Sequence, residues 1–217
     1  MGRTSDARDR LIEAGISRFW KKGFSGVSVD DLCNSAGVKK GSFYHFFESK
    51  EELALAALEK HWERRRPILD VSFSASVPPL ERLERYFEFI FQRQSELKRE
   101  TGHVLGCFYF SLGSASLEHP RIAERVREIT TTYERYYEST LREAQSLGLV
   151  TLRDPSEKAR SLFAYIEGLM ASARIQNDVE SLAHLGTRAF EFLGLNPPPR
   201  EPACPDAVHH SAVPHSA

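Results

Sequence analysis

The stretch VSVDDLCNSAGVKKGSFYHFFESKEEL, residues 27–53, decides the fold of this chain. Ser28 precedes a short segment with acidic residues in its first turn, and the segment stops at Gly37. These are the signals of a capped helix, because a hydroxyl at the N-cap and carboxylates near it satisfy exposed backbone amides. A second short helix is expected over Lys39 to Phe47. Two short helices joined by a glycine-containing turn predict a helix-turn-helix, whose second helix enters the DNA major groove.

The residue types in and around the second helix suit DNA recognition. Lysines supply positive charge for phosphates or guanine edges, and hydroxyl and imidazole groups suit phosphate or base contacts. Gly41 keeps the helix surface low, while Phe43 and Phe46 point the other way and anchor the helix. Lys50 begins the next helix, where it would help to clamp a phosphate. The candidate DNA-binding residues are Ser28, Lys39, Lys40, Gly41, Ser42, Tyr44, His45 and Lys50.

Helix signals continue along the chain and strand signals are scarce, so we predict an all-α fold with nine helices. Pro67 is expected to end the fourth helix, with a loop over 69–77 after it. The expected helices span 6–22, 28–36, 39–47, 49–66, 79–101, 106–119, 120–147, 155–176 and 178–193. Asp154 and Asp178 are expected to cap the last two of these helices. Residues 196–217 hold many prolines and show no periodicity, which predicts a disordered tail.

The charge of the chain is unevenly distributed. There are 29 Lys and Arg against 30 Asp and Glu, and a near-zero balance is unusual for a nucleic-acid binder. Residues 1–50, however, hold nine basic against six acidic side chains, so the remainder carries the acidic excess. A basic head on an acidic body favours DNA binding through the head alone.

Several classes of protein are excluded by what the sequence lacks. There is no apolar run long enough for a membrane span and no secretory signal, which indicates a soluble cytoplasmic protein. Cys33, Cys107 and Cys204 are too far apart for metal-binding or redox motifs, and we expect no disulfide, metal or cofactor. No acid–base pair, nucleophile with a base or nucleotide-binding loop is visible, so we expect no catalytic residues and no enzyme.

The N-terminal region resembles the TetR family of one-component transcriptional repressors. An amphipathic helix ending in KKGF and the run SVDDLCNSAGVKKGSFYHFFESKEELALAAL carry the resemblance, over about residues 6 to 60. Ser28 stands where Thr is commoner in the family, and the hydroxyl is kept. The resemblance implies that Ser28 contacts phosphate. It also implies that the residues facing DNA are Lys39, Lys40, Ser42, Tyr44, His45 and Lys50.

The resemblance also implies an architecture and a mode of action. The expected domains are a DNA-binding head at 1–48 and a ligand-binding and dimerisation domain at 49–195, followed by the tail at 196–217. Such a protein would bind a pseudo-palindromic operator as a homodimer and leave it when a small apolar, aromatic or electrophilic inducer binds. Two recognition helices about 34–36 Å apart would read successive major grooves.

The same resemblance implies that the last two long helices pair with their copies as a four-helix bundle. Gly168 and Ala171 are small enough for close approach. The candidate dimer-interface residues are Phe163, Ile166, Leu169, Ala173, Leu182, Leu185 and Phe190.

Many aromatic residues in the predicted ligand-binding domain together suggest a large apolar cavity. Taken singly, such aromatic residues more often belong to the core, and the polar candidates, His103 included, more often lie on the surface or at helix ends. The candidate ligand-binding residues are His61, Trp62, Phe87, Cys107, Phe110, Tyr133, Tyr137, Phe163, Met170 and Arg174.

Cys107 admits two interpretations. It follows a glycine break at the start of a predicted helix, where a lowered thiol pKa would suit an electrophile or oxidant sensor. The other interpretation is that Cys107 is a small buried hydrophobic residue, as free cysteines usually are. For the whole chain, the alternatives to a repressor are an all-α small-molecule-binding protein or enzyme, and an interaction module without specific DNA binding.

Overall fold

The computed structural model describes residues 2–113 and 118–195. Within these residues the chain forms nine α-helices and one 3-10 turn and contains no strand, which confirms the predicted all-α fold. The helices are α1 Gly2–Lys22, α2 Val29–Ala36, α3 Lys40–Phe46, α4 Lys50–Ser72, α5 Pro79–Thr101, α6 Phe108–Gly113, α7 Pro120–Ser146, α8 Pro155–Gln176 and α9 Leu185–Phe192, with the 3-10 turn η1 at Glu180–Leu182.

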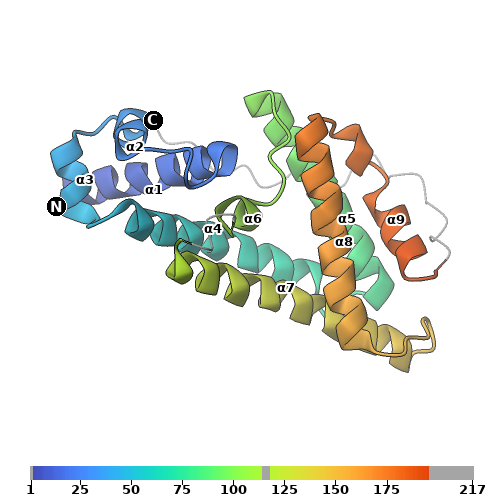
Figure 1. Ribbon diagram of the computed structural model, residues 1–217. Coiled ribbons are helices and arrows are strands. Elements are labelled where there is room, and N and C mark those ends of the chain that lie inside the picture. Colours follow the sequence, from blue (N-terminus) through green and yellow to red (C-terminus); the bar gives the residue numbers. More distant parts are fainter. Residues whose placement is uncertain (1, 114–117, 196–217) are drawn as a thin grey trace.

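Helices α1, α2 and α3 form a compact head at one end of the molecule (Figure 1). Ser28 caps α2 as predicted: its hydroxyl accepts a hydrogen bond from the Asp31 amide, and the Asp31 carboxylate accepts one from the Ser28 amide. Gly37 ends α2 with φ of 64°, a left-handed conformation in which a side chain would be strained. These local signals fix the turn that orients α3.

The body is built on α4, which leads away from the head beside α7, with α5, α8 and α9 at the far end (Figure 1). Helix α6 is short and packs against both α1 and α7. Asp154 caps α8 by accepting hydrogen bonds from the amides of Ser156 and Glu157, as its position in the sequence predicts. No helix among the described residues is long and apolar enough to cross a membrane.

The prediction that Pro67 ends the fourth helix is wrong, because α4 runs through it to Ser72. Pro67 is exposed, and the helix beyond it is held by tertiary packing. Leu69 is fully buried, and the Phe73 ring lies against Tyr86 and Tyr137 at centroid distances of 5.2 and 5.7 Å. Burial of these side chains offsets the backbone hydrogen bond that proline removes.

The last helix also differs from the prediction. Asp178 still accepts a hydrogen bond from the Glu180 amide, but the expected helix over 178–193 divides into η1 and α9. The division allows Leu182 and Leu185, on either side of it, both to be buried. The helix expected over 106–119 is shorter, as α6, although four of its positions lie outside the described residues, and so does the tail at 196–217.

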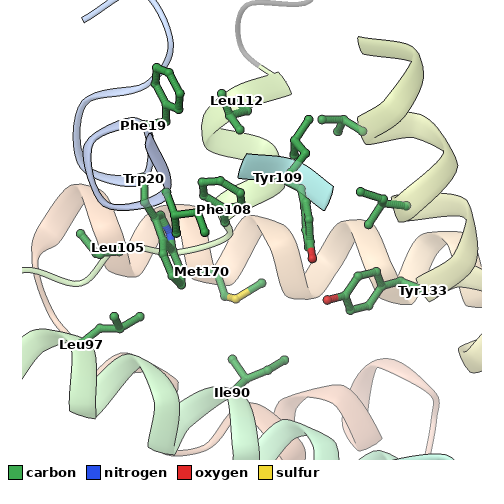
Figure 2. Packing of buried hydrophobic residues seen from close by; sticks show 14 of the residues in the cluster. Phe19, Trp20, Ile90, Leu97, Leu105, Phe108, Tyr109, Leu112, Tyr133 and Met170 are labelled. Atoms are coloured by element: carbon green, nitrogen blue, oxygen red, sulfur yellow. The ribbon is translucent and has the colours of Figure 1, made fainter. Parts of the chain in front are cut away.

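Head and body share one continuous hydrophobic core. Trp20, near the end of α1, reaches between Leu105 and Phe108 of the body (Figure 2), and its indole Nε1 donates a hydrogen bond to the Gly106 carbonyl at 3.0 Å. Arg174 of α8 donates to the Lys21 carbonyl at 3.0 Å. The end of α1 is therefore attached to the body by hydrogen bonds from both sides.

Candidate DNA-binding surface and ligand cavity

Helix α3 presents polar side chains to solvent on the face expected to meet DNA. Lys39, Gly41 and His45 are exposed, and Tyr44 is 54% exposed although its ring lies against Phe43. Phe43 itself is fully buried and holds α3 to the head. A Cβ added at Gly41 would meet no atom of the protein within 4 Å, so this position faces open space that DNA can approach.

Two other candidate residues are already engaged within the head, and a third is half-buried. Lys40 makes an exposed ion pair with Asp30 at 2.9 Å. The Ser28 hydroxyl donates to the Asp31 carboxylate at 2.7 Å, so its hydrogen is not free for a phosphate. Ser42 is half-buried on the same helix.

Lys50 is placed differently from the expectation that it clamps a phosphate. Its ammonium donates to the carbonyls of Phe24 and Val27 at 3.0 and 2.9 Å and lies 4.1 Å from the centroid of the Phe24 ring. Burial lowers the pKa of Lys50. Two of its three donors thus tie α4 to the loop before α2, and the residue acts mainly as a structural clamp.

A small inner cavity lies where α1, α4, α5, α6, α7 and α8 converge. Its volume is about 50 Å³, and Ile90, Met170 and Tyr133 lie around it (Figure 2). It adjoins an outer groove of about 370 Å³ between α1, α4 and α5. The two share the side chains of Trp20, His61, Arg65, Phe89 and Arg93, so the groove is the entrance to the cavity.

Several titratable groups in the wall of the inner cavity are uncharged near neutral pH. Burial raises the pKa of Glu167 to about 8, and its carboxyl shares a hydrogen bond with the Cys107 thiol. Burial and the neighbouring Arg65 lower the pKa of His61 to about 3, so its ring is neutral and pairs with the Tyr109 hydroxyl at 3.0 Å. Burial likewise raises the pKa of Tyr133, whose hydroxyl points into the same space as that of Tyr109 (Figure 2).

Two family models match the chain. Residues 11–57 match the model described as bacterial regulatory proteins, tetR family, and residues 79–189 match the tetracyclin repressor-like C-terminal domain. Together the models cover most of the chain, including the whole helix-turn-helix. The chain belongs to the TetR family.

Curated relatives and solved structures agree with the family models. The chain is 33% identical to the HTH-type transcriptional repressor DhaR of Mycobacterium sp. (strain GP1) over 89% of this chain and 94% of the relative. It is 32% identical to the transcriptional regulator AcuR of Cereibacter sphaeroides, over 85% and 83% of the two chains. The crystal structure of the regulatory protein TetR from Rhodobacter sphaeroides superposes with a TM-score of 0.74 at 30% identity, over 85% and 96%. The protein is a TetR-family transcriptional regulator, and its relatives are regulators rather than enzymes.

Six of the ten ligand-binding candidates line the inner cavity of this TetR-family protein, and four do not. Those that line it are His61, Cys107, Tyr133, Tyr137, Phe163 and Met170. Trp62 and Phe87 pack behind the wall against Tyr133 and Tyr137, and Phe110 is 48% exposed. Arg174 donates hydrogen bonds to the carbonyls of Lys21 and Leu105, which places it at the junction of head and body. His103 is exposed in the loop after α5.

Sequence reasoning missed much of the cavity. The lining residues outside the candidate set are Trp20, Arg65, Tyr86, Phe89, Ile90, Arg93, Gln94, Gly106, Phe108, Tyr109, Ile166 and Glu167, of which Phe89, Phe108 and Tyr109 belong to the aromatic residues that suggested a cavity. The single sequence signal for Glu167 is a carboxylate inside the apolar run FAYIEGLM. Trp20 belongs to the apolar stripe of the first helix, which in the sequence indicates only packing within the head. The expected large cavity is small, because tyrosine and phenylalanine rings fill most of the space between the helices.

Cys107 does not have the environment expected for a reactive thiolate. Burial and the neighbouring Glu167 raise its pKa well above the usual thiol value, and hydrogen bonds from the backbone of Phe110 and Tyr109 offset this only in part. The thiol therefore stays protonated at neutral pH, contrary to the lowered pKa that its position before α6 suggested.

Most of the candidate dimer-interface residues lie inside the subunit. Only Leu169 is partly exposed; the others are buried against neighbouring helices of the same chain, namely Phe163, Ile166, Ala173, Leu182, Leu185 and Phe190. The outward face of α8 carries small residues instead, among them Ala164 and Gly168. The same face also carries a large aliphatic residue, Ile175, which is 84% exposed.

Proposed function

We propose that this protein is a ligand-responsive repressor that binds a pseudo-palindromic operator as a homodimer and leaves it when a small molecule occupies the inner cavity. The observation that carries the proposal is Trp20. It belongs to α1, which packs against both helices of the helix-turn-helix, and it also lines the cavity. A ligand that displaces this side chain acts on the head directly.

In this proposal the head binds DNA and the body binds the ligand. The head, proposed as residues 1–48, places Lys39, Tyr44 and His45 where they can contact phosphates and base edges. The body, residues 49–195, holds the cavity. Exposed Lys39 has no carboxylate partner among the described residues, whereas Lys40 does, so we expect Lys39 to contribute more to DNA binding.

The outward face of α8 is the proposed dimer surface. Ala164, Gly168 and Ala171 are exposed and have small side chains or none, which allows a second copy of the helix to come close. Ile175 projects from the same face, and an aliphatic side chain exposed to 84% gains from burial by about 1.5–3 kcal/mol. Leu169 is the one member of the predicted set that can join this surface without unpacking the subunit.

The path from cavity to head runs through the segment between α5 and α6. The Gly106 carbonyl accepts hydrogen bonds from Trp20 Nε1 and from Gln94 Nε2, each at 3.0 Å. Arg174 joins Leu105 of this segment to Lys21 at the end of α1. A ligand must favour one arrangement of these contacts over the other by differential affinity in order to release DNA.

A gel shift with the promoter DNA beside the protein's own gene, at stated salt, tests DNA binding. We expect specific binding below micromolar concentration, weakened about tenfold by Tyr44→Ala if the tyrosine makes one base or phosphate contact. Lys39→Ala should also reduce the salt dependence by about one unit of slope, because one phosphate contact is lost.

Lys60→Ala is the matched control, since Lys60 lies on α4 away from α3 and makes only a surface ion pair with Glu63. The control should bind as the wild type does. The proposal fails if the wild-type protein gives no specific shift at any sub-micromolar concentration.

A further inference from the structure

Arg65 stands at the entrance to the inner cavity without a carboxylate partner among the described residues. It lines both the groove and the cavity, and its guanidinium lies 4.9 Å from the centroid of the Phe89 ring. Its field reaches into the site: after burial, Arg65 is the next cause of the lowered pKa of His61, and it offsets part of the rise that burial causes in the pKa of Tyr86, Tyr109 and Tyr133. The cation is therefore close enough to the wall to act on a bound ligand.

The other charged side chains around the site are either paired or lie outside the inner cavity. On α4 and α1, Arg64 pairs with Glu13, and on α5, Arg93 pairs with Glu96 at 3.0 Å. Lys21 and Glu100, of opposite sign, lie at the outer groove and not in the inner cavity.

The remaining ionisable groups of the wall carry no charge that could offset Arg65. Glu167 of α8 is mostly protonated at pH 7, and His61 is neutral. Arg65 is thus the one uncompensated charge that faces the inner cavity in the described part of the chain, and burial strengthens its attraction for an anion.

The cavity volume limits the part of a ligand that it can hold. A cavity of about 150 Å³ holds a benzene ring, and about 10–15 Å³ is enough for one water. The inner cavity, at about 50 Å³, therefore has room for roughly four water-sized groups before any side chain moves. Its lining includes the aliphatic side chains of Ile90, Ile166 and Met170.

We propose that the site binds a short-chain organic monoanion, a carboxylate with a small aliphatic body. The carboxylate lies on the Arg65 guanidinium, on the side of the tyrosine hydroxyls of the inner cavity, and the aliphatic part points toward Ile90 and Met170. Guanidinium and carboxylate match in shape and charge, and such charge-assisted hydrogen bonds are about twice as strong as neutral ones. This names the ligand class of the cavity invoked under the proposed function.

Propanoate and propanamide, which have the same shape and differ in charge, test the proposal on the full-length wild-type protein. Binding is measured by isothermal titration calorimetry and thermal shift. We expect propanoate to bind and raise Tm, because a ligand that binds only the native state stabilises it, and we expect propanamide to bind at least about tenfold more weakly. Equal binding of the two, or no binding of propanoate, overturns the proposal.

Variants on α4 locate the charge. Arg65→Gln should weaken propanoate binding by at least about tenfold and leave propanamide unaffected, whereas Arg65→Lys should retain part of the preference for the anion. Arg66→Gln is the matched control: Arg66 is the next residue, exposed, and lies 3.9 Å from Asp70 outside the site. Equal loss in the Arg65 and Arg66 variants would show a general charge effect and overturn the assignment.

Failure of the ligand-class proposal can be distinguished from failure of the proposed function. Propanoate binding that depends on Arg65 in a protein without operator binding leaves the ligand class standing and removes the repressor assignment. If the protein binds its operator but does not discriminate propanoate from propanamide, the repressor assignment stands and the ligand class is removed.

Discussion

Glu167 makes a strong prediction about the pH dependence of stability. Its carboxyl is 6% exposed, and burial raises its pKa from 4.5 to about 8. Because the folded pKa is raised, the protonated group favours the folded state fully below about pH 4.5, and this stabilisation is lost as pH rises through 8. The displacement corresponds to roughly 5 kcal/mol of unfolding free energy, at about 1.4 kcal/mol for each pH unit.

Glu167→Gln keeps the shape and removes the ionisation. The unfolding free energy of the variant minus that of the wild type should therefore increase by roughly 4 kcal/mol between pH 4.5 and 8.5, most of the full displacement. Urea unfolding at closely spaced pH values measures this difference. His61, with its pKa lowered to about 3, contributes stability that is lost as pH falls below about 6.5, and this contribution cancels in the subtraction because both proteins contain it.

Glu157→Gln is the control, since Glu157 is an exposed carboxylate on the same helix. Its stability curve should run parallel to that of the wild type. If the Glu167→Gln curve is also parallel, the carboxyl is ionised in the folded protein. The cavity would then contain a negative charge that offsets Arg65.

Four further predictions concern other parts of the molecule. Lys50→Met should lower the unfolding free energy by roughly 2 kcal/mol in urea, because two hydrogen bonds to carbonyls are lost; unchanged stability with weakened DNA binding would restore a phosphate-binding role. Ile175→Glu should shift the protein to monomer in light scattering, whereas Val71→Glu, a change at another exposed aliphatic residue, should not. With the other two cysteines changed to Ser, Cys107 should react with N-ethylmaleimide at least about tenfold more slowly in the folded than in the urea-unfolded protein; rapid reaction accompanied by DNA release would support a sensing thiol. Trp20→Phe removes the donor to Gly106 and should weaken ligand-induced release about fivefold at unchanged operator affinity; unchanged release would separate this contact from the response.

The features predicted well from the sequence depend on short-range interactions. The cap at Ser28 and the left-handed Gly37 involve partners within a few residues, so their signals are contiguous in the chain. Asp154 before α8 is of the same kind. The order of the helices followed from such signals together with the spacing of apolar residues.

The features that could not be predicted depend on contacts between distant segments. Lys50 stands where the family motif suggests a phosphate contact, yet the carbonyls that bind it are 23 and 26 residues away. Arg65 lies in the run ERRR, which in sequence is indistinguishable from a solvated helix face. Only the packing of α1 and α5 against α4 makes one of these arginines line a cavity.

Gly106 shows how the cavity and the head are coupled through one backbone position. Its φ is +65°, and a Cβ there would lie 3.4 Å from the Met170 carbonyl of α8, so the segment fits closely against the cavity wall. The Gln94 side chain accepts from the amides of Leu105 and Gly106 and donates to the Gly106 carbonyl, which fixes the segment on α5. Trp20 bonds to that same carbonyl. We therefore expect a ligand that shifts the α8 backbone at Met170 to disturb this segment and, with it, the hydrogen bond that holds Trp20 of α1.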